Sequence, residues 1–418
     1  IARPNATNTG TNAAGNVRGR APKIQSCSPL GCFSILLVSH FQAPTLMTVK
    51  RLVALDMPAS IEFANHVRNA WDSGDAVFPI DQRLPQAAKN VMIQQFKPSV
   101  LIDANGSVIN LSDSEPIDEH DALVIATSGS TGNPKGVVHT HDSIRALLNM
   151  SQARLQTDAS THWLLCLPVS HVAGFSVLAR SIVFGNPITI LPKFDESNVK
   201  AAARNGATHV SLVPTALRRI DPSIFNTILL GGAAAPANLP ANVFTTYGMT
   251  ETFGGIAYNG TPLDGVDMRV VDEQIEVRSA SLFRSYRISN TNHLTDGWYR
   301  TGDNGSFSNN ELRVFGRSDD MIITGGENVW PSEVEKAVAT FPGVERVAVV
   351  GVDDAQWGQR VVAFIVSSLD NGPSLQDIRD HVKQQLPAFC APSDIRLLND
   401  FPTTSLGKVD VQSLKALL

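Results

Sequence analysis

The stretch at residues 126–136 reads A-T-S-G-S-T-G-N-P-K-G, a run of small hydroxyl and glycine residues with one lysine near its end. An apolar run at residues 122–126 leads into it and is bounded as a buried strand would be. Glycines let backbone N–H groups approach an anion, while hydroxyl donors and a lysine add to the binding of negative charge. A flexible linker rarely follows a buried strand, and the order is not that of a Walker A loop. We therefore predict a polyphosphate-binding loop formed by Thr127, Ser128, Gly129, Ser130, Thr131, Gly132 and Lys135.

Residues 246–252 form a second polar segment, which reads T-Y-G-M-T-E-T. Tyr247 can stack on a flat ring such as adenine, and Thr250 can donate a hydrogen bond to phosphate. Glu251 offers the hard carboxylate oxygen that Mg²⁺ prefers beside the phosphates of ATP. Upstream, residues 231–236 read G-G-A-A-A-P, and such small side chains leave room for a flat ring against the backbone. The residue types of the two segments would suit a flat ring and a hard cation beside phosphate groups.

The stretch T-S-G-S-T-G-N-P-K-G resembles the phosphate-binding signature of the adenylate-forming enzymes, which include acyl-CoA synthetases, luciferases and the adenylation domains of peptide synthetases. Later segments match the same family in the same order, so that the resemblance covers most of the chain from about Asp75 onward. It implies binding of ATP, Mg²⁺ on Glu251, catalytic roles for Thr250 and Glu251, and a ribose contact at Asp303. The resemblance places the rest of the ATP site on Gly232, Ala233, Tyr247, Gly248, Met249, Thr250, Asp303 and Arg317.

The C-terminal part of the resemblance concerns a hinge, a loop and a lysine. Asp319, in G-R-S-D-D, matches the hinge position of the family. Lys408, after S-L-G, stands at the place of the adenylation lysine, whose charge can stabilise the transition state at the α-phosphate. The family often has a basic residue two or three places later, where this chain has Asp410 and Val411. The resemblance assigns contact with CoA and the hinge to Asp319, Gly325, Gly326, Glu327 and Asn328.

The segment at residues 171–181, H-V-A-G-F-S-V-L-A-R-S, bears on the acyl substrate. Arg180 stands among apolar residues of an expected helix, where an arginine either reaches out to solvent or pairs with an anion. The segment resembles the corresponding one in the o-succinylbenzoate–CoA ligases of menaquinone biosynthesis, whose substrate carries two carboxylates. This resemblance implies that Arg180 faces the carboxylate that does not react, and that His171 lies near the acyl pocket and has a catalytic role. A packed turn histidine is the alternative for His171. Gly255, in a second segment of similar sequence, joins His171 and Arg180 as a substrate-binding candidate.

The resemblance implies an ATP-dependent acid–thiol ligase that adenylates 2-succinylbenzoate, transfers the acyl group to CoA, and releases AMP and pyrophosphate. Another aryl- or acyl-CoA ligase, of the benzoate or fatty-acid kind, is an alternative, because G-G-E-N at residues 325–328 also resembles benzoate-type ligases. An adenylation domain that loads a carrier protein is less favoured, because no carrier segment with a modifiable serine is visible. A non-catalytic homologue is disfavoured by the intact Lys135, Glu251, Asp303 and Lys408.

The composition fits a globular protein of two or three domains, with 418 residues, 43% hydrophobic residues, 17% charged residues and a net charge of −5. The slight acidity gives no support for a nucleic-acid partner, and no apolar run approaches the roughly 20 residues of a membrane helix. The four cysteines show neither a CxxC pair nor metal-ligand spacing, so that reduced thiols of a cytoplasmic protein are the simplest account. Small-molecule substrates are the expected partners, with a homo-oligomer as an open possibility.

The order of apolar runs predicts an α/β fold. Strands at residues 75–80, 163–167, 188–191, 209–213 and 227–230 alternate with helices at 61–69, 142–150 (capped by Asp142) and 175–184, which is typical of wound, mainly parallel sheets. Residues 266–289 alternate as a small antiparallel β subdomain would. Pro331 is expected at the first position of a helix over 332–340, followed by strands at 344–352 and 360–366 and a helix at 374–386. This part predicts a small α+β lid domain.

The domain boundaries follow from these patterns. Residues 1–46 are expected to be a disordered or upstream extension, because residues 1–16 are rich in Asn, Thr, Ala and Gly. Met47 is expected to be the natural start, because an enzyme that uses ATP and CoA belongs in the cytoplasm. A secretory signal around the apolar run at 33–38 is the alternative. We expect an N-terminal adenylate-forming domain at 47–316, a hinge at 317–320 and a C-terminal lid domain at 321–418. His139 and His141 are interpreted as structural, since no third metal ligand stands nearby in the sequence.

Overall fold

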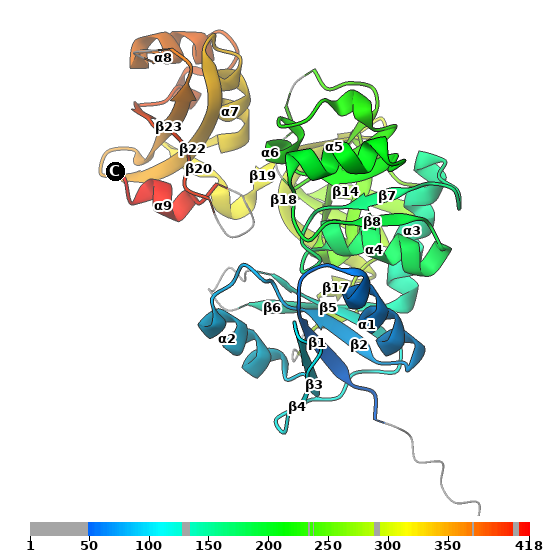
Figure 1. Ribbon diagram of the computed structural model, residues 1–418. Coiled ribbons are helices and arrows are strands. Elements are labelled where there is room, and N and C mark those ends of the chain that lie inside the picture. Colours follow the sequence, from blue (N-terminus) through cyan, green and yellow to red (C-terminus); the bar gives the residue numbers. More distant parts are fainter. Residues whose placement is uncertain are drawn as a thin grey trace, which may run out of the picture. The chain divides into compact units, whose positions relative to one another are not determined.

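The computed structural model describes residues 49–127, 134–232, 235–236, 238–287, 293–369, 372–403 and 409–418 (Figure 1). The expected extension at residues 1–46 lies outside the described residues. Within the described part, the chain forms four β-sheets, two with seven strands and two with five. No helix in these ranges is both long and apolar enough to cross a bilayer.

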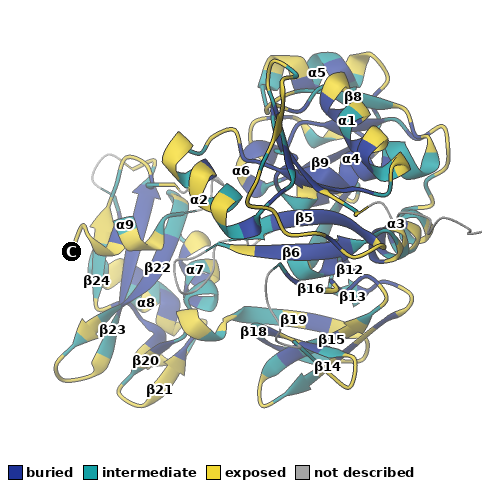
Figure 2. Ribbon diagram, turned by 90° about the horizontal axis from the view of Figure 1, so that it is seen from below, coloured by how far each residue is buried: buried dark blue, intermediate teal, exposed yellow. Residues whose placement is uncertain are grey.

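The first sheet has the strand order β16-β6-β5-β2-β1-β3-β4. Its centre is parallel, because β1 pairs with β2 and β3 and β2 pairs with β5 in that sense. The apolar run that precedes the phosphate loop forms β5, and its residues 121–125 are buried, as the dark blue ribbon in Figure 2 shows. The strands are β1 (Leu52–Asp56), β2 (Ala76–Pro79), β3 (Val100–Asp103), β4 (Val108–Asn110), β5 (Asp121–Thr127), β6 (Lys135–Thr140) and β16 (Ser285–Tyr286).

Three helices accompany this sheet, namely α1 (Ile61–Asp72), α2 (Gln86–Phe96) and α3 (His141–Leu155). The prediction that Asp142 caps α3 is wrong. Thr140 is the N-cap, because its hydroxyl accepts the N–H of Ser143 at 3.1 Å while the Ser143 hydroxyl accepts the N–H of Thr140 at 3.1 Å. This reciprocal pair satisfies two backbone donors at the first turn, which Asp142 inside the helix could not do.

The second sheet has the order β13-β12-β11-β10-β9-β7-β8, and the five strands from β11 to β8 run parallel. Buried strands here alternate with helices, so that the predicted wound, mainly parallel arrangement is confirmed. The strands are β7 (Trp163–Leu165), β8 (Ile188–Ile190), β9 (His209–Leu212), β10 (Thr227–Leu230), β11 (Val243–Met249), β12 (Gly254–Tyr258) and β13 (Thr261–Pro262). The helices are α4 (Val172–Phe184), α5 (Glu196–Arg204), α6 (Pro214–Leu217), and the 3₁₀ helices η1 (Pro222–Ile224) and η2 (Thr250–Thr252).

The third sheet is the predicted small antiparallel one, with one departure. Its strands are β14 (Val266–Val271), β15 (Gln274–Ser279), β17 (Leu294–Thr295), β18 (Trp298–Ser308) and β19 (Glu311–Arg317). We expected the whole of residues 266–289 here, but β16 leaves this sheet and pairs antiparallel with β6 of the first sheet, Tyr286 opposite Val137. Local alternation of residue types predicts a strand but not its partner, and this pairing spans about 150 residues of sequence.

The C-terminal part forms its own α+β layer around a five-stranded sheet. Helix α7 begins at Pro331 as predicted and buries Val334, Ala337 and Val338 in a core shared with Ala363 and Ile365 of β23. The fold class is thereby confirmed. The elements are η3 (Ser318–Asp320), β20 (Ile322–Thr324), β21 (Glu327–Val329), α7 (Pro331–Ala339), β22 (Val344–Asp354), β23 (Gly358–Ser367), α8 (Leu375–Lys383), η4 (Ala388–Cys390), β24 (Asp394–Leu397) and α9 (Val411–Lys415).

Candidate active site

The predicted phosphate loop lies between the strands β5 and β6 in the sequence. Residues 128–133, which carry Ser128, Gly129, Ser130, Thr131 and Gly132, lie outside the described residues, as do Ala233 and Lys408. The two ends of the loop are described, and they lie side by side, because Thr127 and Lys135 are register partners in the β5–β6 hairpin. The Thr127 hydroxyl donates to the Lys135 carbonyl at 3.4 Å. A hairpin therefore holds Lys135 at the mouth of the loop, where its side chain is exposed.

Glu251 lies in η2, directly after β11, and its backbone is fixed on both sides. The N–H of Phe283 donates to the Glu251 carbonyl at 2.8 Å, and His139 Nε2 donates to the carbonyl of Thr250 at 2.7 Å. Burial lowers the pKa of His139 to about 4, although its hydrogen bond to Thr250 works in the opposite direction. The His139 ring is therefore neutral near pH 7 and serves to hold η2 in place.

One tyrosine brings Lys135 and Glu251 together. The hydroxyl of Tyr286 donates to Glu251 Oε1 at 2.8 Å, and Lys135 Nζ lies 5.2 Å from the centre of the Tyr286 ring. Tyr286 is buried, and burial together with the charge of Glu251 raises the pKa of its phenol. The hydroxyl consequently stays protonated and acts as a donor. Sequence reasoning did not find Tyr286; its segment was assigned only to the antiparallel subdomain.

Asp303 on β18 is the centre of a second group of polar contacts. The Tyr247 hydroxyl donates to Asp303 Oδ2 at 2.8 Å, and Arg317, its register partner on β19, places Nε 3.8 Å from Oδ1. Burial raises the pKa of Asp303, while Tyr247 and Arg317 lower it. The hydroxyl of Tyr299, on the same strand as Asp303, lies 3.2 Å from the hydroxyl of Tyr286. Lys135 and Glu251 thus contact Tyr286, whereas Tyr247 and Arg317 contact Asp303. The charge of Glu251 is near enough to contribute to the raised pKa of Asp303.

Two glycines of the predicted site are required by close packing between β11 and β12. Gly248 and Gly255 are register partners next to an irregularity in the pairing. A Cβ on Gly248 would stand 1.9 Å from the carbonyl oxygen of Gly254, and one on Gly255 would stand 2.8 Å from the Cβ of Thr246. Both positions therefore exclude any side chain. Met249 is the residue before η2, and Gly232 follows β10 with a φ of +86°, a left-handed conformation that favours glycine.

Arg180 is buried in the helix α4, with 3% of its surface exposed. Its Nη2 donates to the hydroxyl of Ser151 at 2.8 Å, which in turn bonds to the Tyr258 hydroxyl at 2.7 Å. The guanidinium carbon lies 4.6 Å from the centre of the Trp163 ring, and Nε has no partner in the described part of the chain. Burial lowers the pKa of Arg180, and no described carboxylate opposes that effect. Arg180 is thus a buried cation without an anionic partner among the described residues.

His171 is the N-cap residue of α4 and belongs to a polar cluster. Its Nε2 lies 3.2 Å from Asp81 Oδ2 and 2.8 Å from Arg83 Nη2. Burial alone would raise the pKa of Asp81, but hydrogen bonds from Arg83 and His171 hold it well below its ordinary value. Gly174 lets the turn close, since a Cβ there would lie 2.3 Å from the Pro168 carbonyl oxygen. No role was predicted for Asp81 or Arg83, although a charged pair directly after the parallel strand β2 was the available signal.

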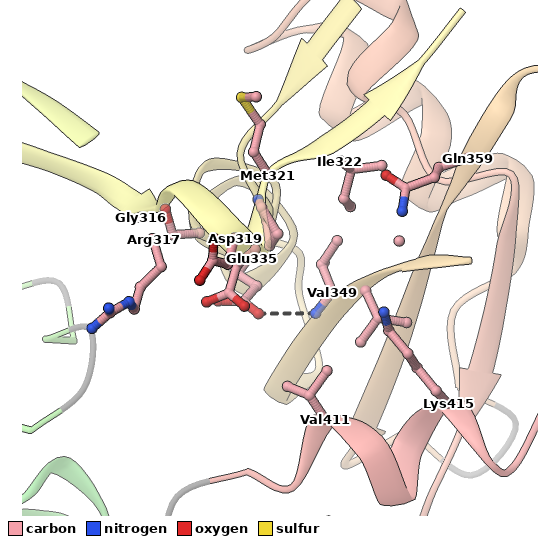
Figure 3. A pocket seen from close by; sticks show the side chains of 15 residues that line it. Gly316, Arg317, Asp319, Met321, Ile322, Glu335, Val349, Gln359, Val411 and Lys415 are labelled. Atoms are coloured by element: carbon pink, nitrogen blue, oxygen red, sulfur yellow. Dashed lines mark hydrogen bonds between the residues drawn. The ribbon is translucent and has the colours of Figure 1, made fainter. Parts of the chain in front are cut away.

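The expected CoA loop and hinge form two separate features. Residues 322–329 make the β20–β21 hairpin, with Gly325 and Gly326 at its turn at φ of +61° and +86° and with Glu327 and Asn328 exposed. Asp319 lies in η3 and lines a pocket of about 210 Å³ (Figure 3). In this pocket Glu335 accepts the N–H of Val349 at 2.9 Å, and Figure 3 shows Arg317 extending away from Glu335.

We expect Glu335→Gln to reduce the pH dependence of stability. Burial raises the pKa of Glu335 to about 7. The nearby charge of Asp320 raises this pKa further, while the hydrogen bond from Val349 and the charge of Lys336 lower it. A raised folded pKa stabilises the fold fully below the unfolded value, and this contribution is lost as the pH rises through about 7. Allowing for partial exposure, the loss between about pH 5 and about pH 8 is roughly 2 kcal/mol. Urea unfolding of wild type, Glu335→Gln and the control Glu333→Gln at both pH values measures it. If the free energy of unfolding of Glu335→Gln fell between the two pH values by as much as that of the wild type, the assignment would be contradicted.

The fold and the site define a member of the AMP-binding enzymes. The family model of the AMP-binding enzyme matches residues 103–286, and that of the AMP-binding enzyme C-terminal domain matches residues 333–408. This chain belongs to that family, and the resemblance to adenylate-forming enzymes is thereby confirmed.

Two relatives of this chain are named as ligases of the same acid. A probable 2-succinylbenzoate–CoA ligase of Mycobacterium tuberculosis is 37% identical over 330 residues, covering 72% of this chain and 85% of that protein. The 2-succinylbenzoate–CoA ligase of Escherichia coli K12 is 33% identical over 315 residues, covering 69% of this chain and 67% of that one. Among solved structures, the o-succinylbenzoate coenzyme A synthetase of Bacillus subtilis in complex with ATP and magnesium ion has a TM-score of 0.77 and 25% identity, with 88% of this chain and 90% of that chain covered.

Proposed function

We propose that this chain is an AMP-forming acid–thiol ligase that adenylates 2-succinylbenzoate and transfers the acyl group to CoA, in the synthesis of menaquinone. The observation that carries the choice of substrate is Arg180, a buried cation with no carboxylate partner in the described residues. Such a group is costly unless an anion pairs with it. A substrate with a second carboxylate supplies that anion, and the relatives named above act on such a substrate.

In the first half-reaction a carboxylate oxygen of the acid attacks the α-phosphorus of ATP, the bond to the β,γ-phosphates breaks, and pyrophosphate leaves with the electron pair. The acid becomes an acyl-adenylate, whose AMP is a good leaving group. Lys135 at the mouth of the phosphate loop offsets the charge of the polyphosphate. Lys408 stabilises the extra negative charge at the α-phosphate in the transition state.

The residues around Glu251 fit a magnesium ion. Mg²⁺ takes oxygen ligands and is usually held by one or two carboxylates together with substrate phosphates. Glu251 is partly exposed, and its Oε1 accepts one hydrogen bond from Tyr286, which leaves the second oxygen for a cation. When bound, the ion neutralises charge on the phosphates. Thr250, beside Glu251, would donate to phosphate.

The remaining polar residues orient the nucleotide. Asp303 would accept the ribose hydroxyls, since its carboxylate is held by Tyr247 and Arg317 on either side. Tyr247, whose hydroxyl is engaged with Asp303, keeps its ring for adenine. The adenine would lie against the small residues after β10. The ATP site that we propose comprises Thr127, Ser128, Gly129, Ser130, Thr131, Gly132, Lys135, Gly232, Ala233, Tyr247, Gly248, Met249, Thr250, Asp303 and Arg317.

In the second half-reaction the CoA sulfur attacks the acyl carbonyl carbon, the bond from that carbon to the AMP oxygen breaks, and the thiol proton is released. We propose that the C-terminal lid, residues 321–418, turns about the hinge at 317–320 between the two steps. The turn at Asp319 would withdraw Lys408 and bring the β20–β21 hairpin with Gly325, Gly326, Glu327 and Asn328 to the site. His171, Arg180 and Gly255 would line the acyl side.

ATP and CoA are cytoplasmic metabolites, so that we place the enzyme in the cytoplasm. The proposal needs no nucleic-acid partner, and it holds for a monomer or a homo-oligomer. The residues 47–316 would form the adenylate-forming domain in either case.

A panel of acids tests the proposal. Purified protein with ATP, Mg²⁺ and CoA is given 2-succinylbenzoate, benzoate, octanoate or an amino acid, and pyrophosphate and AMP are measured. We expect 2-succinylbenzoate to give the highest kcat/KM, by about 100-fold over benzoate, since only it pairs with Arg180. Without CoA, pyrophosphate should appear in a single burst and AMP should not accumulate. A preference for benzoate or octanoate would favour the rival aryl- or acyl-CoA ligase, and no release with any acid would refute the ligase.

A further inference from the structure

A short segment, Phe283–Arg287, contacts both the lysine and the carboxylate of the proposed ATP site. The N–H of Phe283 donates to the Glu251 carbonyl at 2.8 Å, and the N–H of Arg287 donates to the Gly136 carbonyl at 2.6 Å, one residue after Lys135. Between these bonds, Tyr286 pairs with Val137 as part of β16. This segment therefore joins η2, which carries Glu251, to the start of β6, which carries Lys135.

The side chain of Tyr286 lies between the two opposite charges. Its hydroxyl donates to Glu251 Oε1 at 2.8 Å and its ring stands 5.2 Å from Lys135 Nζ. Neither Lys135 nor Glu251 forms an ion pair with another residue of the described ranges. A direct ion pair between the two would neutralise both charges. A tyrosine contacts a cation with its ring and an anion with its hydroxyl, so that it can hold both without neutralising either.

We infer that Tyr286 is a positioning residue that sets the separation between the metal-binding carboxylate of Glu251 and the phosphate-binding ammonium of Lys135. This inference rests on the proposed function, and it adds to it a residue that does not itself touch the reacting atoms. The carboxylate and the ammonium are thereby kept apart by one aromatic ring, as two groups that must act on the same Mg²⁺-bound triphosphate require.

Tyr286 is itself held firmly enough for this role. Its side chain is 9% exposed, its ring centre lies 4.8 Å from that of Phe283 and 4.5 Å from that of His293, and its hydroxyl lies 3.2 Å from that of Tyr299. The guanidinium of Arg287 donates to backbone carbonyls of Phe96 and Pro116 at 3.0 and 2.7 Å. These bonds tie the residue after β16 to the end of the helix α2 and to the segment before β5, so that the position of the tyrosine is determined by the fold.

The contact of Tyr286 with Glu251 and its contact with Lys135 can be tested separately. ATP binding is measured calorimetrically, with no acid present, in Mg²⁺ and in EDTA. Tyr286→Phe keeps the ring and loses the hydroxyl. We therefore expect the ratio of ATP affinity in Mg²⁺ to that in EDTA to be about 10-fold smaller than in the wild type. Binding in EDTA should not change in this variant. Tyr286→Leu also loses the ring face, and its ATP affinity in EDTA should fall about threefold in addition.

Two controls distinguish positioning from packing. Tyr299→Phe removes the hydroxyl that contacts the Tyr286 hydroxyl but leaves the bond from Tyr286 to Glu251, so that the magnesium effect should fall less than in Tyr286→Phe. In a Glu251→Gln background, Tyr286→Phe should cause no further loss of the magnesium effect. Melting temperatures are recorded for every variant. A lower melting temperature of Tyr286→Phe with an unchanged magnesium effect would reduce Tyr286 to a packing residue and overturn the inference. If the wild type bound no ATP in Mg²⁺, the proposed function itself would fail.

Discussion

Replacing Arg180 with leucine is expected to raise the KM for 2-succinylbenzoate by about 100-fold, with the KM for ATP within about twofold of the wild type. The guanidinium is buried in α4, on the face of Trp163, and has no carboxylate partner in the described part of the chain. A charge of this kind binds an incoming carboxylate strongly, because little water competes with it. Initial rates with 2-succinylbenzoate and with benzoate measure the effect, and benzoate, which has no second carboxylate, should be insensitive to the change.

The same substitution is expected not to lower thermal stability. Removing a buried cation that has no counter-ion among the described residues also removes the cost of its desolvation, which offsets the loss of packing when the smaller leucine takes its place. Arg180→Lys keeps a charge but lacks the planar fork, so that it should recover only part of the affinity. Arg219→Leu serves as a matched control, because Arg219 also lies over an aromatic ring, with its guanidinium carbon 5.0 Å from the ring centre of Phe194, but is exposed. Equal KM values for wild type and Arg180→Leu would exclude Arg180 from the acyl site.

Lys408→Ala is expected to slow formation of the acyl-adenylate about 1000-fold, while CoA transfer from a supplied acyl-adenylate stays within about threefold of the wild-type rate. The two half-reactions need different groups, since only the first builds charge on the α-phosphate. Lys408 lies outside the described residues, but the segment that carries it is closed by an antiparallel bridge between Thr403 and Val409. That bridge fixes the residue directly after the lysine.

Single-turnover experiments separate the steps, with pyrophosphate followed in the first and thioester in the second. Lys383→Ala, a lysine of the same C-terminal part on α8, should change neither rate. Equal loss in both half-reactions would count against a lid that exchanges Lys408 for the β20–β21 hairpin.

Much of this fold could be predicted from local patterns. The apolar run before the predicted phosphate loop became β5, four strands of the second sheet (β7, β8, β9 and β10) and the helix α4 fall within a few residues of their expected ranges, and α7 begins at Pro331. These features depend on neighbours in the sequence, namely periodic burial, turn residues and a proline at the first helical position. The same reasoning failed for the cap of α3, because Thr140 and Asp142 are both good caps and only the end of β6 decides between them.

The long-range contacts of the site could not be predicted in this way. Tyr286 contacts Glu251 and Lys135, which lie 35 and about 150 residues away in the sequence. It does so from the two-residue strand β16, which pairs with the first sheet and not with the predicted antiparallel one. The cluster of Asp81 with Arg83 and His171 likewise joins a loop to a helix N-terminus about 90 residues away. The motif residues marked where the nucleotide chemistry lies, but the side chains that hold them belong to segments without any motif of their own.

Oxygen transfer from the acid to AMP is the most direct test of carboxylate activation. The enzyme is given 2-succinylbenzoate with ¹⁸O in both carboxylates, together with ATP, Mg²⁺ and CoA, and the products are analysed by mass spectrometry. Attack of a carboxylate oxygen on the α-phosphorus, followed by cleavage at the acyl carbon, predicts AMP with one ¹⁸O atom and a thioester that keeps the other oxygen of that carboxylate. Unlabelled AMP, or label in phosphate or pyrophosphate, would contradict the account.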